Sequence, residues 1–338
     1  MPVVHILNQY LWPDGAPTGV YAEQLAVALQ NAGHTVRLVG GSGCYRKSER
    51  TEPPVPRIIV PHFQGKRGRH LSAFREYYSV HHAFAEYIGT RVKKNDIVIV
   101  TSAPPTTLSL AKVIRQVGAI SIYWLQDYYP ELIRGVWDYP AFLRAPIRTW
   151  WSRQLAKWDR VIKAAGNIYG DGNNIQVIRN WPTIHFPQNR LEPKSKTALY
   201  AGNFGYGHHL PSFVAKCREL LDAGYEIKLH ADGPGVAQLP EWLPNRGSFK
   251  NEAELQRTLQ ECDTHLVAGH PEIQHAVFPS KIWNSIALER KIVPTGFAGA
   301  MTQELEIITS QPPENSLSCW CDLVSKISPL PELAGVPL

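Results

Sequence analysis

The sequence has no long apolar run. None of its stretches approaches the ~20 consecutive apolar residues that a helix needs to cross a bilayer. The first residues also lack the basic region and apolar core of a secretory signal. We therefore expect a cytoplasmic protein that is neither exported nor membrane-spanning.

Cysteine is scarce as well, with five in 338 residues. The five are scattered and are not spaced like the ligands of a zinc site: Cys44, Cys217, Cys262, Cys319 and Cys321. We interpret them as reduced thiols of a cytosolic protein. Cys319 and Cys321 are close enough in sequence to form a metal or redox pair, but a packing role is the simpler interpretation.

Apolar residues are plentiful, at 44% of the chain. Over 338 residues this is enough for two domains of ordinary size, each with its own core. Sequence repeats and low-complexity tracts are absent, so neither a disordered nor a fibrous protein is indicated.

One pattern occurs twice: an apolar strand, a glycine-rich turn and a helix. The first copy runs from Val3 to Leu25 and contains Gly15 and Gly19, and the second runs from Leu199 to Leu210. Such a turn offers backbone N–H groups and a helix N-terminus outside the strand ends, so the two copies predict two Rossmann-like domains. We expect a phosphate-bearing ligand to bind between them. Gly15 and Gly19 would let the backbone approach it, although turns often need glycine for geometry alone.

Strand and helix patterns alternate along the rest of the chain. The expected strands are Val3–Tyr10, Thr35–Gly40, Asp96–Thr101, Ala119–Leu125, Thr197–Ala201, Glu226–Ala231, Thr264–Ala268 and Lys291–Thr295, and the expected helices are Val20–Ala32, Thr107–Val117, Leu210–Ala223, Glu252–Glu261 and Ser280–Leu288. Prolines between Trp181 and Lys196 favour a linker. We expect an N-terminal domain at 1–185, a linker at 186–196, a C-terminal domain at 197–315, and a tail at 316–338 that packs back on the N-terminal domain.

Basic residues concentrate in the N-terminal half. Seven Lys or Arg lie between Lys66 and Lys94, and seven more between Arg134 and Lys163, against two acidic residues in each window. The net charge of the two windows together exceeds the whole chain's net charge of +6, so the remainder of the chain is slightly acidic.

We predict a helix from Pro146 to Lys163 that carries both aromatic and basic residues. Its membrane or acceptor face would consist of Trp150, Trp151, Arg153, Lys157, Trp158 and Arg160. This combination is typical of a peripheral helix on anionic lipid. It is equally typical of a helix that packs its tryptophans into the core and leaves a solvated basic face. Nucleic acid is a weaker alternative, because no nucleic-acid-binding motif accompanies the charge.

Seven segments occur in an order that resembles a known enzyme family. They are QYLWPDGAPTGVYAEQLAVALQNAGHTV, VIVTSAPPTTLSLAKVIR, WLQDYYPEL, VIRNWPTIHF, YAGNFG, LHADGPG and FPSKIWNSIALERKIVPTG, within Pro2 to Gly296. Together they resemble bacterial glycosyltransferases of the family 4 type, in the colanic-acid and O-antigen subgroup. The resemblance implies an α/β protein of the GT-B fold, with the acceptor on the N-terminal domain and a nucleotide-diphosphate sugar on the C-terminal one. It also implies that neither a metal ion nor a cofactor is needed.

The resemblance assigns positions to the donor site. Many relatives have an arginine and a lysine after the first strand of the C-terminal domain, where this chain has Asn203 and His208, beside Gly202. A site without metal must stabilise the leaving diphosphate with cations and backbone N–H groups. We therefore assign that role to Lys281 and Ser280, at the start of a predicted helix. A solvated first-turn lysine is the alternative.

Typical relatives also use two glutamates, with seven residues between them, on the donor sugar and the ribose. This chain has Ala276 and Asn284 at those positions. Asn284 retains the capacity to hydrogen-bond a ribose hydroxyl, whereas alanine has none. Glu272 or His270, just upstream, is a candidate replacement, and both are equally compatible with a surface loop.

Asp127 follows a predicted buried strand, at the edge where an open α/β sheet presents its ligand-binding side chains. The family often has His-Asp here, followed by an aromatic residue, proline and glutamate; this chain has Gln126, Asp127 and Glu131. Glutamine takes no proton, so we assign the catalytic base to Asp127, with Glu131 second. Capping of the following turn is the alternative role of Asp127. Retention and inversion at the anomeric carbon both stay open.

We therefore expect a glycosyltransferase that moves a sugar from a nucleotide-diphosphate sugar to a lipid-linked or cell-surface glycan. A polyprenyl-diphosphate-linked glycan is one candidate acceptor, and the enzyme would bind it at the inner face of the cell membrane. Two alternatives stay open: a catalytically degenerate sugar-nucleotide-binding subunit that activates a partner, and a GT-B nucleotide-sugar epimerase.

Overall fold

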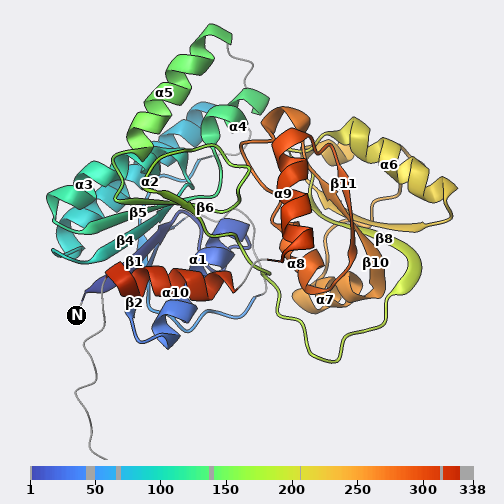
Figure 1. Cartoon of the computed structure of the whole chain (residues 1–338), viewed down its shortest axis with the longest axis horizontal. Helices are drawn as coiled ribbons and strands as arrows, with labels where there is room; N and C mark the ends of the chain where they lie inside the picture. The colour runs from blue at the N-terminus through green and yellow to red at the C-terminus, as the bar shows by residue number, and fades with distance from the viewer. Residues whose placement is uncertain are drawn as a thin grey trace, which may run out of the picture.

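Two parallel β-sheets organise the chain (Figure 1). The computed structural model describes residues 2–42, 50–65, 70–136, 141–205, 207–312 and 315–327. Cys44 and the last part of the expected tail lie outside these residues.

The first sheet belongs to the N-terminal half. Its strands are β1 (Val3–Asn8), β2 (Thr35–Gly41), β3 (Arg57–Val60), β4 (Ile97–Thr101), β5 (Ile120–Leu125), β6 (Arg160–Lys163) and β7 (Ile175–Val177). Their order across the sheet is β3-β2-β1-β4-β5-β6-β7, all parallel. Val and Ile dominate β4, which is buried along its whole length, as expected for a parallel sheet covered on both faces.

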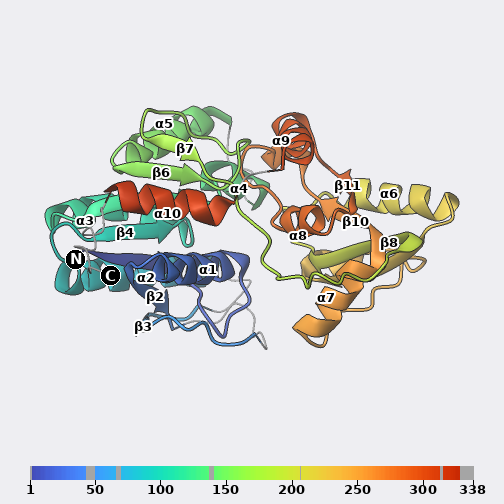
Figure 2. The ribbon, with the colours of Figure 1, turned by 60° about the horizontal axis from the view of Figure 1, so that its bottom comes forward.

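Helices cover both faces of this sheet. They are α1 (Pro17–Asn31), α2 (His70–Arg91), α3 (Ala111–Gln116), α4 (Tyr129–Val136) and α5 (Arg144–Leu155), joined by α10 (Ser316–Ile327) from the end of the chain. One buried cluster joins α1 and α10 to the sheet, and another joins α2, α3 and α5 to it. Trp320 of α10 packs 4.9 Å from Trp124 of β5, between ring centroids, and Figure 2 shows α10 lying along the N-terminal domain.

The second sheet is smaller and also parallel. Its strands are β8 (Lys194–Asn203), β9 (Glu226–Asp232), β10 (Cys262–Ala268) and β11 (Lys291–Thr295), in the order β11-β10-β8-β9, and its helices are α6 (Leu210–Asp222), α7 (Glu252–Glu261), α8 (Lys281–Ala287) and α9 (Gly299–Ser310). The expected architecture of two Rossmann-like α/β domains is therefore confirmed.

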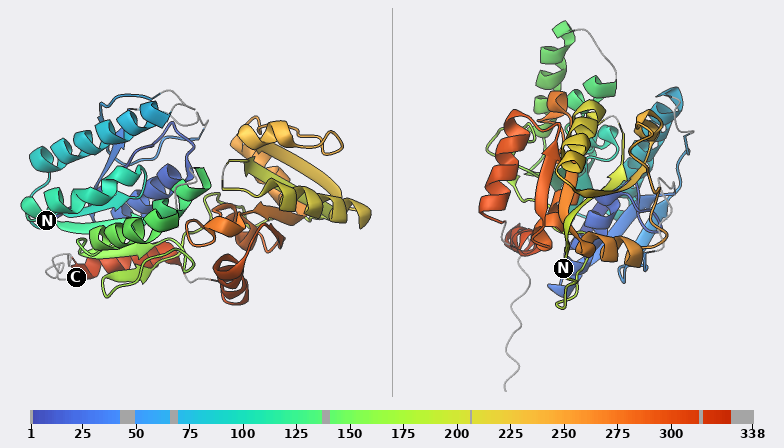
Figure 3. Two further views of the ribbon diagram at one scale, coloured as in Figure 1. Left: turned by 90° about the horizontal axis from the view of Figure 1, so that it is seen from above. Right: turned by 90° about the vertical axis from the view of Figure 1, so that its right-hand side faces the viewer.

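The two domains lie side by side (Figure 3) and are hydrogen-bonded to each other. Tyr128 N donates to Ala276 O at 2.7 Å, and Tyr169 N donates to His275 O at 3.0 Å. In each sheet the strand order reverses, between β1 and β4 and between β8 and β10. Open sheets bind ligands outside the carboxyl ends of the strands at such a reversal.

The predicted helix from Pro146 to Lys163 is wrong at its C-terminal end. The helix α5 ends at Leu155, and Arg160–Lys163 forms β6 beside β5. Asp159 holds the chain at this point, because its Oδ2 accepts hydrogen bonds from Ser121 N and Ser121 Oγ at 2.8 and 2.7 Å. A strand of four residues is too short to interrupt the helical periodicity of the surrounding sequence, so the prediction extended the helix through it.

Candidate functional site

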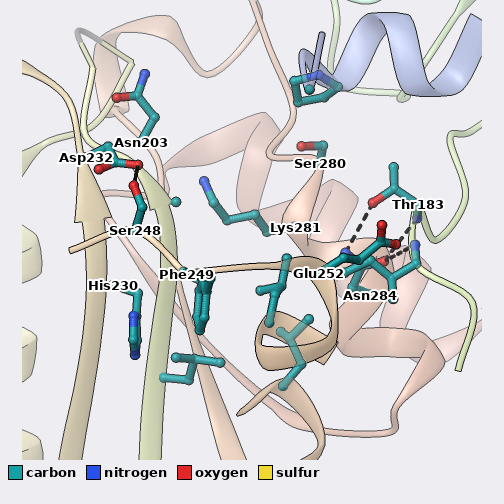
Figure 4. A pocket seen from close by; sticks show the side chains of 18 of the residues that line it. Thr183, Asn203, His230, Asp232, Ser248, Phe249, Glu252, Ser280, Lys281 and Asn284 are labelled. Atoms are coloured by element: carbon teal, nitrogen blue, oxygen red, sulfur yellow. Dashed lines mark hydrogen bonds between the residues drawn. The ribbon is translucent and has the colours of Figure 1, made fainter. Parts of the chain in front are cut away.

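A large cavity of about 790 Å³ lies between the two domains. Gly15, Pro17 and Arg50 line it from the N-terminal domain, and Asn203 and Lys281 line it from the C-terminal domain. Its volume is typical of small-molecule sites, which span ~300–1,000 Å³. Figure 4 shows several of its side chains from close by.

Lys281 crosses the end of β8 because Gly202 has no side chain. Gly202 has a φ of +154°, and a Cβ there would collide with Cε of Lys281. The Nζ of Lys281 lies 5.4 Å from the ring centroid of Tyr200, and Figure 4 shows it pointing into the cavity. The helix that Lys281 begins has only seven residues, so the positive charge here comes mainly from the ammonium group.

His208 adds no positive charge at neutral pH. Burial, and next the charge of Lys281, lower the pKa of His208 to about 3. Its Nδ1 accepts a hydrogen bond from Gly205 N at 3.2 Å. Asn203 and His208 therefore bring no positive charge to the large cavity at neutral pH.

Arg50 brings a cation to the opposite wall of the large cavity. Its Nη1 donates to Glu23 Oε2 at 2.8 Å, and Glu23 is buried in α1. This ion pair fixes the guanidinium beside Gly15. Sequence reasoning missed Arg50, because it lies in a loop outside every motif.

Sequence reasoning also missed the aromatic wall at the far end of the large cavity. The rings of His230 and Phe249 stack with centroids 4.0 Å apart and an interplanar angle of 15°. Beside them, Ser248 Oγ donates to Asp232 Oδ2 at 2.6 Å (Figure 4). The segment LHADGPG contained a signal for His230 and Asp232, since it ends a strand at the ligand-binding edge.

Asn284 lines the large cavity but is largely occupied by the backbone. Its Oδ1 accepts from Thr183 N and Ile184 N at 3.0 and 3.3 Å, and its Nδ2 donates to Thr183 Oγ1 at 3.3 Å. Asn284 therefore ties the chain before the linker to α8, and one amide hydrogen is left for a ribose. Ala276 is fully buried at the domain joint described above.

Glu272 and His270 line neither cavity described here. His270 accepts a hydrogen bond from Glu272 N at 3.2 Å, and the Glu272 side chain is exposed. Gly19 also lies outside both cavities: a Cβ there would collide with Tyr10 O, so Gly19 serves the packing of α1.

A small cavity of about 200 Å³ adjoins the large one, since Pro17 and Ser280 line both. Asp127 lines the small cavity, and burial raises its pKa to about 6. Ser102 Oγ accepts hydrogen bonds from Gln126 N and Asp127 N at 3.1 and 3.0 Å, which fixes this turn. A carboxyl group with a pKa near neutrality suits general base catalysis.

Glu131 is held away from the small cavity. Its Oε1 accepts a hydrogen bond from Arg148 Nε at 2.5 Å, and its side chain is buried in α4. Of the two carboxyl groups that the sequence suggested as a base, Asp127 lines one of these two cavities and Glu131 lines neither.

Only part of the expected membrane face is exposed. Trp150 is half exposed, and Arg153, Lys157 and Arg160 are exposed. Trp151 and Trp158 are buried, and Trp158 Nε1 donates to Leu108 O at 3.0 Å, so these two tryptophans do not lie on that face. In the described ranges, no helix has the length and apolarity that a bilayer crossing requires.

No family model and no curated protein matches the chain. Solved structures do match. An α,α-trehalose 6-phosphate synthase from Burkholderia multivorans is 12% identical with a TM-score of 0.57, over 96% of each chain. A UDP-forming α,α-trehalose-phosphate synthase from Burkholderia vietnamiensis is 11% identical with a TM-score of 0.57, again over 96% of each chain. The chain has the GT-B fold. In this GT-B protein, both cavities lie at the carboxyl edges of the sheets.

Proposed function

We propose that the protein is a glycosyltransferase that moves a sugar from a nucleotide-diphosphate sugar to an acceptor hydroxyl, without a metal ion. The observation that carries this proposal is the pair of adjoining cavities. The large one presents Lys281 and Arg50 from opposite domains, and the small one presents Asp127 with a raised pKa.

The chemistry follows from these three groups. Asp127 takes the proton of the acceptor hydroxyl, and the oxygen bonds to the anomeric carbon of the donor sugar. The bond from that carbon to the diphosphate breaks, and the electron pair leaves with the nucleoside diphosphate. Lys281 and Arg50 stabilise the negative charge that grows on the diphosphate.

Exposed apolar side chains at the start of α2 support a lipid-linked acceptor. Leu71, Phe74 and Tyr78 are 83, 62 and 55% exposed. Their spacing of three and four residues places them on one face of the helix. The helix reaches the carboxyl edge of the sheet, where Gln9 Nε2 donates to Glu76 Oε1 at 2.8 Å. Such a patch is typical of contact with lipid or another apolar partner.

With this acceptor we propose a cytoplasmic enzyme that is peripheral on the inner face of the cell membrane. Trp150 and the exposed cations Arg153, Lys157 and Arg160 would meet anionic lipid. The resemblance to family 4 enzymes of colanic-acid and O-antigen synthesis supports a polyprenyl-diphosphate-linked glycan as the acceptor.

The test is acceptor-dependent release of nucleoside diphosphate. Purified protein is incubated with UDP-glucose, UDP-galactose, GDP-mannose or dTDP-rhamnose, with and without polyprenyl-diphosphate-linked sugars, and products are identified by mass spectrometry. We expect release of the nucleoside diphosphate only when the acceptor is present, together with a product heavier by one sugar. Donor binding without turnover would favour the sugar-nucleotide-binding subunit, and an isomerised donor would favour the epimerase.

A further inference from the structure

Three buried polar atoms in the small cavity have no partner among the residues that the structure describes. They are Tyr21 Oη, Gln126 Nε2 and Asn180 Oδ1. The residues that carry them are 1, 7 and 7% exposed. Buried polar groups are nearly always hydrogen-bonded, because an unmade bond leaves the desolvation cost uncompensated. Three such atoms around one cavity therefore indicate a ligand.

The ring of Tyr21 and the backbones of Gln126 and Asn180 are fixed around the cavity. The ring of Tyr21 packs edge-on against Trp181, with centroids 5.3 Å apart. The backbone of Gln126 is fixed by the hydrogen bond to Ser102 Oγ, and Asn180 N donates to Ala164 O at 3.2 Å. A site with prearranged polar groups loses little entropy when a ligand enters.

The chemistry of the three atoms matches sugar hydroxyls. Asn180 Oδ1 accepts a hydrogen bond, Gln126 Nε2 donates one, and Tyr21 Oη does either. A hydroxyl group also does both, so neighbouring hydroxyls of one ring satisfy this set. Among the described residues that line the cavity, none is lysine or arginine, and Asp127 is the acidic one. A carboxylate or phosphate on the sugar would therefore find no cation there.

The position of the cavity indicates the sugar of the donor. Ser280, next to Lys281, lines both cavities, so a sugar joined to a diphosphate at Lys281 has a direct way into the small one. The C-terminal domain offers apolar surface there, from Phe278 and Trp283. Ala276 of the same domain is buried and has no polar side chain. The N-terminal domain therefore supplies most of the polar groups that line the small cavity, and Ser280 is the polar residue that lines it from the C-terminal domain.

We propose that Tyr21, Gln126 and Asn180 bind the hydroxyl groups of the transferred sugar, and that this sugar is neutral. The inference rests on the proposed function and assigns the sugar-specific contacts within it. Asp127 closes the same cavity and faces the acceptor oxygen.

The test separates binding of the sugar from binding of the nucleotide. Calorimetry on the parental protein first identifies which of UDP-glucose, UDP-galactose, GDP-mannose and dTDP-rhamnose binds tightest. Tyr21→Phe, Gln126→Leu and Asn180→Leu are then titrated with that donor and with its nucleoside diphosphate. We expect each variant to bind the donor ~3- to 10-fold more weakly, as loss of one neutral hydrogen bond implies, and the nucleoside diphosphate with parental affinity. Tyr123→Phe is the matched control, because Tyr123 is an equally buried tyrosine that lines neither cavity.

Three results would overturn the inference. The first is donor affinity that is unchanged in all three variants. The second is unchanged donor affinity with a raised KM for the acceptor, which would mean that the small cavity binds the acceptor. The third is binding of UDP-glucuronic acid as tight as that of UDP-glucose. If the parental protein binds none of the donors or their nucleoside diphosphates, the proposed function itself fails, and this outcome is distinct from the other three.

Discussion

The two cavities of this protein differ in charge although they share a wall. The large cavity is lined by the cations Arg50, Lys250 and Lys281 and by the carboxylates Asp232 and Glu252, and Arg50 and Lys281 approach from different domains. The small cavity holds a carboxyl group and neutral polar atoms instead. The difference separates two tasks of glycosyl transfer: the large cavity stabilises the charge of the leaving diphosphate, and the small one hosts the exchange of bonds at the sugar.

The largest expected effect is in the small cavity. Asp127→Asn keeps the size of the side chain but removes the base, so acceptor-dependent turnover should fall ~10²–10⁴-fold. Donor affinity should remain parental, because the carboxylate acts only when the hydroxyl attacks. Turnover and nucleotide affinity are measured on the same preparation. Near-parental turnover would show that Asp127 only shapes the turn, and Glu131 would then be tested in the same way.

A smaller effect is expected in the large cavity. Lys281→Ala should weaken nucleoside-diphosphate binding by ~10- to 100-fold, as loss of a charge-assisted contact worth ~1.5–3 kcal/mol implies. Calorimetry measures the affinity, and thermal unfolding checks the fold.

Lys291→Ala is the matched control for Lys281→Ala. Lys291 also lies over a tyrosine ring, with its Nζ 5.9 Å from the centroid of Tyr225, but it lines neither cavity. Equal affinities of the parental protein and Lys281→Ala for the nucleoside diphosphate would show that Lys281 does not bind the phosphate.

The pH dependence of turnover should follow the ionisation of Asp127 in the small cavity alone. Because burial raises the pKa of Asp127 to about 6, the base is protonated below that pH. We expect kcat/KM to fall about tenfold per pH unit below 6 and to be level just above it. A carboxyl group at its ordinary value of 3.8 would place this step two units lower. The residual activity of Asp127→Asn should lack the step, and a step that persists in this variant would belong to another group.

The smallest effect concerns the surface rather than either cavity. Replacing Arg153, Lys157 and Arg160 by glutamine should reduce binding to anionic vesicles about fivefold for each charge that faces lipid. Binding should also fall with salt. Co-sedimentation measures it, and replacement of the basic residues Arg190, Lys216 and Arg246, which lie in the linker and the C-terminal domain, provides the control. Equal binding by both triple variants would mean that the basic face is merely solvated.

The sequence predicted the fold well because both domains repeat one local pattern. The strand, turn and helix at Val3 and again at Leu199 are short-range features, and so are the buried strands that alternate with helices. Lys281 and Asp127 could be predicted for the same reason, since Lys281 begins a recognisable helix and Asp127 follows a recognisable strand. Both line cavities in the structure.

The roles of residues that depend on long-range packing could not be predicted from the sequence. Trp151 and Trp158 alternate with basic residues in a way that suits a membrane helix, but helical periodicity does not tell which side faces the core. Arg50 reaches the large cavity through its pairing with Glu23, 27 positions away in sequence. Gln126 and Asn180 line one cavity because the chain after β7 runs back beside the end of β6, where Asn180 N donates to Ala164 O. No local pattern records these encounters.

The measurement that tests the division between the two cavities most directly is a crystal structure with an intact nucleotide sugar bound. We expect the diphosphate within hydrogen-bond distance of Lys281 Nζ and the sugar ring in the small cavity, with its hydroxyls on Tyr21, Gln126 and Asn180. A diphosphate that contacts neither Lys281 nor Arg50, or a sugar that points away from Asp127 into solvent, would contradict it.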